Sequence, residues 1–102
     1  MAFNNQTSAA VGTSEVTVYT VPSGKEDVLV GVNLSNLVTS QIAVTVKVAG
    51  VHLIKGVPIP ANTAFSPLDG KIVLEAGDTV KVTSDTASSC DVILSMLNQD
   101  ES

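Results

Sequence analysis

The side chains that could do acid–base, nucleophilic or metal chemistry are few in this chain and lie far apart. The 102 residues include one histidine, His52, and one cysteine, Cys90. A metal site needs several His, Cys or carboxylate ligands, and a nucleophilic site needs a base near its Ser or Cys. No such motif surrounds His52, which is expected at a strand surface or strand end. The sequence therefore predicts no enzyme, no metal and no cofactor.

The carboxylates show no acid–base pairing either. Asp27, Asp69, Asp78, Asp85 and Asp91 all lie at predicted turns or strand ends, where Asp side chains accept local backbone hydrogen bonds. A calcium site between two such loops is an alternative, because Ca²⁺ binds several carboxylate and carbonyl oxygens. No D-x-D-x-D loop supports it. The Gly-Lys pair in residues 21–25 (VPSGK) lacks the rest of a phosphate-binding loop and is interpreted as a turn.

Composition excludes several classes of partner. The net charge is −5, and the chain contains no arginine. Nucleic-acid binding depends on clustered Lys and Arg, and anionic membranes attract the same residues. The sequence therefore predicts that neither nucleic acid nor a membrane is a partner. No apolar run approaches the roughly 20 residues that cross a bilayer. The N-terminus lacks the features of a signal peptide, and an unpaired Cys90 is expected to be a small core residue in a protein made in a reducing cytoplasm.

The elements that would position these residues are strands. In residues 27–36, Val28, Val30, Val32 and Leu34 fall on one face of a strand, and Leu29 falls on the other. Residues 42–49 alternate in the same way, because successive side chains of a strand point to opposite faces. We expect these two strands to form a hairpin over one core.

Similar short strands separated by turns fill the rest of the chain, among them residues 63–68, 71–75 and 90–97, and Gly77 is expected in a turn. In the last of these strands, alternation puts Cys90, Val92, Leu94 and Met96 on one face. Pro58 and Pro60 confine the strand around them to a sheet edge or to a crossing between sheets. The pattern predicts an all-β fold: a single-domain antiparallel β-sandwich of seven or eight strands, jelly-roll-like or immunoglobulin-like in strand order. Residues 1–13 are expected to form a flexible arm that orders on a partner, residues 14–98 the sandwich, and residues 99–102 a polar tail.

Several apolar side chains are predicted on outer strand faces, which are normally wet. They are interpreted either as scattered surface residues or as a subunit interface. Two of the chain's three aromatic residues are further candidate anchors, since aromatic side chains dominate many interfaces. The predicted interface set comprises Phe3, Tyr19, Leu29, Ile54, Ile93 and Leu97.

Four stretches of the chain together resemble a known class of protein. They are residues 18–25 (VYTVPSGK), 32–36 (VNLSN), 53–55 (LIK) together with 58–61 (PIPA), and 70–82 (GKIVLEAGDTVKV). In this order they resemble small β-sandwich virion structural proteins of tailed bacteriophages, and the resemblance extends from about Val18 to Leu97. These motifs are strand and turn signatures, and no catalytic residue can be carried over from them.

The resemblance implies a non-enzymatic protein of the phage particle, assembled in the bacterial cytoplasm. A capsid decoration (cement) protein, which binds the major capsid protein and stabilises the head shell, is the favoured role. A neck, tail or fibre-attachment protein is the alternative within this class. Such proteins often act as symmetric homo-oligomers, and a trimer is favoured. The alternative from another class is a carbohydrate-binding adsorption module, although few aromatic side chains are present for stacking on sugars.

Overall fold

The chain folds into two packed β-sheets, as predicted. The structure is a computed structural model that describes residues 2–67 and 70–100, with the side chains of residues 2, 3, 99 and 100 outside the description. The described residues form strands and connecting turns. The strands are β1 (Ala2–Val11), β2 (Val16–Thr20), β3 (Lys25–Asn36), β4 (Ile42–Val48), β5 (Val51–Ile59), β6 (Ala64–Phe65), β7 (Ile72–Leu74), β8 (Thr79–Ser84) and β9 (Cys90–Asp100).

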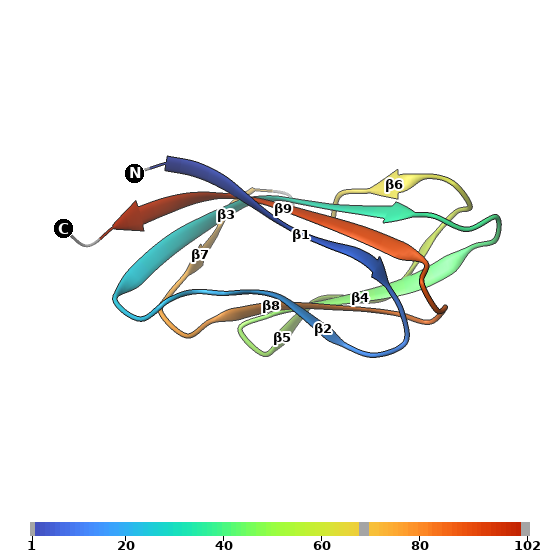
Figure 1. Ribbon diagram of the computed structural model, residues 1–102, viewed down its shortest axis with the longest axis horizontal. Coiled ribbons are helices and arrows are strands. Elements are labelled where there is room, and N and C mark those ends of the chain that lie inside the picture. Colours follow the sequence, from blue (N-terminus) through green and yellow to red (C-terminus); the bar gives the residue numbers. More distant parts are fainter. Residues whose placement is uncertain (1, 68–69, 101–102) are drawn as a thin grey trace.

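The strand order decides between the two predicted topologies. One sheet has the order β1-β9-β3-β6, with β7 also paired to β3, and the other has the order β2-β8-β4-β5 (Figure 1). If β6 and β7 count as one interrupted strand, the first strand pairs with the last, the second with the second-last, and so on to β4 and β5. All of these pairs are antiparallel. A long hairpin rolled in this way is a jelly roll.

The core lies between the sheets and is built from aliphatic side chains. Alternate residues of β4, β8 and β9 are buried and the intervening ones are not, which is the pattern of strands with one face on a core. Cys90, Val92, Leu94 and Met96 of β9 are all buried, as their alternation predicted. The molecule is elongated, with extents of 47 × 20 × 20 Å.

The prediction that residues 27–36 and 42–49 form a hairpin is wrong. They are β3 and β4, which lie in different sheets and face each other across the core. The connection between them crosses from one sheet to the other and is fastened by Asn36. Its side-chain amide donates to the carbonyls of Ser40, Ile59 and Pro60, and its Oδ1 accepts from the Val38 amide.

The predicted outer position of Leu29 is also wrong, because β3 contains a bulge. The register against β9 shifts between Leu29 and Gly31. One extra residue reverses the facing of every side chain on one side of a bulge. Leu29 is therefore buried in the core with Val32 and Leu34, whereas Val28 is only half-buried on the outer face.

The N-terminal segment differs from the expected flexible arm. Residues 2–11 form β1, which pairs with β9 along the edge of its sheet. At the other end of the chain, β9 extends to Asp100 and so includes the start of the expected polar tail, while residues 101 and 102 lie outside the described residues. The paired ends of β1 and β9 lie at one end of the sandwich (Figure 1).

Predictions based on turn residues agree with the structure. The strand that contains Pro58 is β5, at the edge of its sheet. Gly77 has a φ of 88° in the turn before β8, a conformation that costs glycine little because it has no Cβ. Short strands also form where residues 63–68 and 71–75 predicted them, although Leu68 lies outside the described residues.

Candidate functional site

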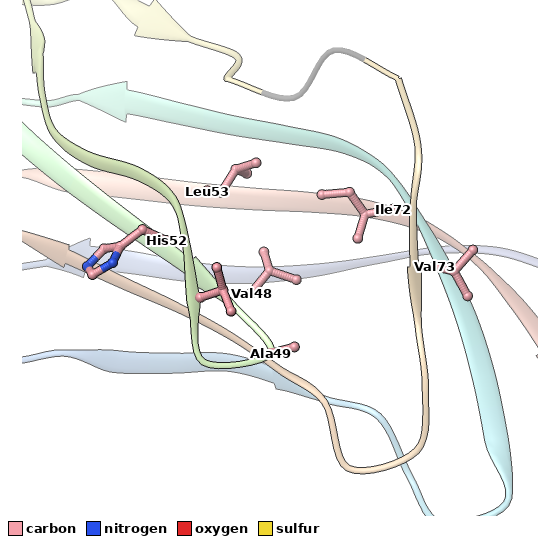
Figure 2. Close-up of a pocket in the computed structure, with 7 residues that line it drawn as sticks. Val48, Ala49, His52, Leu53, Ile72 and Val73 are labelled. Carbon is pink, nitrogen blue, oxygen red and sulfur yellow. The ribbon is translucent and has the colours of Figure 1, made fainter.

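An open apolar groove lies between the edge strands of the two sheets. One wall is the β4–β5 hairpin and the other is β7, which pairs with β3 in the opposite sheet. The groove has a volume of about 250 Å³. Figure 2 shows Ile72 and Val73 leaving β7 in opposite directions, with Ile72 turned toward the hairpin. The lining residues are Val48, Ala49, Val51, His52, Leu53, Ile72 and Val73.

The rim of this groove carries the most exposed large apolar side chains among the described residues. Val51 is 69% exposed and Val73 is 57% exposed. Leu53 and Ile72 are partly buried and pack against the core beneath them. Single exposed valines are common on protein surfaces, whereas apolar side chains that gather around a groove make a candidate interaction site. The groove and its rim are such a candidate site.

The patch continues onto the outer face of the β1-β9-β3 sheet. Val28 lies opposite Leu97 on one side and opposite Val73 on the other. Cross-strand neighbours on one face of a sheet contact each other, so these three side chains form an apolar row that reaches the groove at Val73. Ile93, further along β9, is 43% exposed on the same face. We call the groove and this row the apolar surface.

His52 lies at the groove and belongs to no metal-binding cluster of the described residues. It lies exposed in β5, at the groove, which agrees with its predicted place on a strand surface. Within residues 2–67 and 70–100, no group of three or more His, Cys, Asp or Glu side chains comes together in a way that could hold a metal ion.

Tyr19 and Asp27 form a polar link between the two sheets. A register shift between Thr17 and Tyr19 in β2 lets both Val18 and Tyr19 pack against the core. The Tyr19 hydroxyl donates a hydrogen bond to Oδ2 of Asp27, which is buried in β3. Burial, then this hydrogen bond and then the charge of Asp27 raise the pKa of Tyr19 to about 12, and the side chain of Asn98 opposes them in part.

Cys90 is a core residue, as predicted. It is fully buried and forms no disulfide. Burial, with a further contribution from the charge of Asp91, raises the pKa of its thiol to about 11. Because the thiolate is the reactive form of cysteine, both the burial and the raised pKa disfavour reaction of this thiol in the folded protein.

The structure divides the predicted interface residues into different environments. Ile93 and Leu97 lie on the outer face, where they were expected. Tyr19 points into the molecule, Ile54 is partly buried against the core, and Leu29 is wholly within it. Phe3 lies opposite Leu97 in register, but its side chain is outside the described residues.

Sequence reasoning missed Val51 and Val73, the two most exposed residues of the apolar surface. Val73 is the middle residue of a three-residue strand between two residues that face inward, so alternation does give the signal that it points outward. No local signal gives the exposure of Val51, because the residue follows a turn and its surroundings come from the distant β7.

The described part of the chain contains no helix that is long and apolar enough to cross a membrane. Comparisons of the chain with protein-family models, with curated proteins and with solved structures find no match.

Proposed function

We propose that this protein is a non-enzymatic structural component of a tailed-phage particle, and that it acts as a decoration protein on the head. It would bind the major capsid protein through the apolar surface and so hold neighbouring capsid subunits together. A neck or tail position is the alternative within the same proposal. The apolar surface is the observation that supports a binding role. The assignment to a phage particle rests on the sequence resemblance.

Several features of the molecule support a binding role. Val51 is exposed on one wall of the groove, and Val73 is exposed on the outer side of the other wall, where it adjoins Val28. Burial of apolar area stabilises a complex by about 25 cal/mol per Å² before the costs of association are counted. A jelly roll also occurs in viral capsid proteins and in lectins, so the fold fits the proposal without selecting it.

Sedimentation with emptied heads of the phage that encodes the protein tests the proposal. The purified protein is expected to sediment with the heads at a fixed ratio to the capsid subunit. The variant Val73→Asp should fold normally, because the side chain is already exposed, and should bind heads at least about tenfold more weakly. Thr39→Asp, an exposed position in the β3–β4 connection at the other end of the sandwich, is the matched control.

The outcomes separate the alternatives. A few copies per complete particle, with none on empty heads, would place the protein in the neck or tail. Absence from all virion fractions would overturn the proposal. Equal binding by Val73→Asp and Thr39→Asp would show that another surface makes the contact.

A further inference from the structure

Strand β1 is an edge strand that lacks the usual protection against pairing. A free edge presents unpaired backbone donors and acceptors, and proteins protect it with short length, charge, proline or bulges. The other edge strands here have such protection: β6 and β7 have two and three residues, β2 has five residues and a bulge, and β5 contains Lys55, Pro58 and register shifts.

By contrast, β1 is ten residues long, AFNNQTSAAV, with no charge and no proline. Its register against β9 is regular from Ala2 to Ser8, and the register shift of this pairing lies beyond that stretch, between Ser8 and Val11. Among the described residues, β9 is its only strand partner within the sheet. Asn4, Asn5 and Thr7 are exposed along it. The regular stretch of the strand, residues 2–8, is therefore an accessible template for another strand.

We propose that β1 pairs antiparallel with β1 of a second copy of this chain, which joins the two sheets into one across a two-fold axis. The inference concerns self-association and does not depend on the particle to which the protein binds. In an antiparallel pair the two strands exchange about one backbone hydrogen bond per residue. The seven regularly paired residues span about 24 Å of edge.

The chemistry of β1 fits a copy of itself. The chain carries a net charge of −5, yet β1 carries no charge, so self-pairing brings no like charges opposite each other. A two-fold axis at Asn5 would place Asn5 opposite its own copy and Asn4 opposite Gln6. Both pairs are uncharged amides that can donate and accept hydrogen bonds.

The core provides only weak anchorage for β1. Asn4, Gln6 and Ser8 lie opposite the buried Met96, Leu94 and Val92 of β9, and so lie on the inward face of the sheet. These three positions are polar, and Val11 is the only described residue of β1 in the core. Since burial of apolar side chains normally holds a strand in place, a second copy along the free edge supplies stabilisation that this core does not.

Symmetry favours two copies over the three implied by the resemblance. A two-fold axis uses the same patch on both subunits, whereas a three-fold axis joins two different patches. In a trimer β1 would have to pair with a different edge, and each of the others is short, bulged or interrupted. The groove remains accessible in the dimer, because β1 and β7 lie at opposite edges of the same sheet.

Light scattering over a concentration series measures the mass directly. The protein is expected to have about twice its chain mass of 10.4 kDa. Asn5→Lys places two like charges near the axis and should raise the dimer dissociation constant at least about tenfold. Asn5→Glu should act in the same way, and an equimolar mixture of the two variants should recover the dimer through opposite charges.

Ser95→Lys is the matched control, because Ser95 lies opposite Asn5 on the neighbouring strand β9 and is exposed. It adds the same charge one strand away from the edge and should leave the dimer intact. Circular dichroism checks that each variant is folded. A monomer or a trimer at all concentrations, an equal effect of Asn5→Lys and Ser95→Lys, or no recovery in the mixture would each overturn the proposal.

Discussion

At the scale of single residues, the hydrogen bond from Tyr19 to Asp27 joins a strand of one sheet to a strand of the other. A buried carboxylate without donors costs far more than a neutral group. Asp27 is therefore compatible with the interior only because partners such as the Tyr19 hydroxyl come with it.

Substitution of Tyr19 should reveal this link. Tyr19→Phe removes the hydroxyl and should lower the free energy of unfolding at pH 7 by about 1–3 kcal/mol, measured by urea denaturation. The folded pKa of about 12 lies above the ordinary value of 10.0. The neutral phenol is thus favoured in the folded state. Its contribution to the free energy of unfolding is complete below pH 10 and is lost as the pH rises through 12.

The difference in stability between the native protein and Tyr19→Phe should therefore shrink over that pH range, while the titration of the five lysines cancels in the comparison. Tyr19 is the only tyrosine of the chain, so ultraviolet absorbance of the phenolate follows it directly. An absorbance midpoint at pH 10 in the folded protein would contradict the buried hydrogen bond.

At the scale of elements, bulges decide which side chains enter the core. The shift in β3 puts Leu29 inside and leaves Val28 on the outer face, opposite Leu97 and Val73. The shift in β2 turns Tyr19 inward. Each bulge inserts one residue and so exchanges the faces of the residues on one side of it.

A pair of substitutions measures the effect of the bulge in β3. Leu29→Ala should cost about 2–5 kcal/mol of unfolding free energy, because it leaves a cavity in the core. Val28→Ala should cost about 1 kcal/mol or less, because Val28 is half-exposed. Chemical denaturation of both variants gives the comparison. A strand without the bulge would place Val28 in the core and Leu29 on the outer face. A larger loss of unfolding free energy in Val28→Ala than in Leu29→Ala would therefore show that the bulge is absent.

At the scale of the whole molecule, one core links all the long strands. It contains side chains from both sheets, and Cys90 lies within it at the start of β9. The described strands pair first with last and second with second-last, so most pairings join distant parts of the chain. Loss of one pairing then exposes the core shared by the rest, which favours cooperative unfolding.

The reactivity of Cys90 tests this cooperativity. Its thiol is buried, with a pKa raised to about 11, so a thiol reagent should label it only when the molecule opens. In Leu29→Ala the labelling rate should rise about tenfold for each 1.4 kcal/mol of lost stability. An exposed thiol introduced by Thr39→Cys serves as a control for the reagent. A labelling rate that is the same in Leu29→Ala as in the native protein would indicate local opening around Cys90.

Much of the fold was predictable because its signals are local. Alternating apolar residues predicted the strands around residues 27–36, 42–49 and 90–97. Turn residues such as Gly77 predicted where the chain reverses its direction. Part of the candidate site was predictable for the same reason: Ile93 and Leu97 lie on the outer face as expected. Val73 was missed although alternation in residues 72–74 signals its outward position. Val51 was missed because the groove exists only where β5 and β7 lie near each other across the two sheets.

The sequence by itself thus determined the all-β class, the position of most strands and the aliphatic composition of the core. Tertiary structure alone decided that β3 and β4 face each other instead of pairing, that β1 joins the sheet, and that Leu29 lies inside. The physical reason is that strand pairing and register depend on contacts between residues far apart in the chain. One inserted residue, as in β3, is enough to exchange inside and outside.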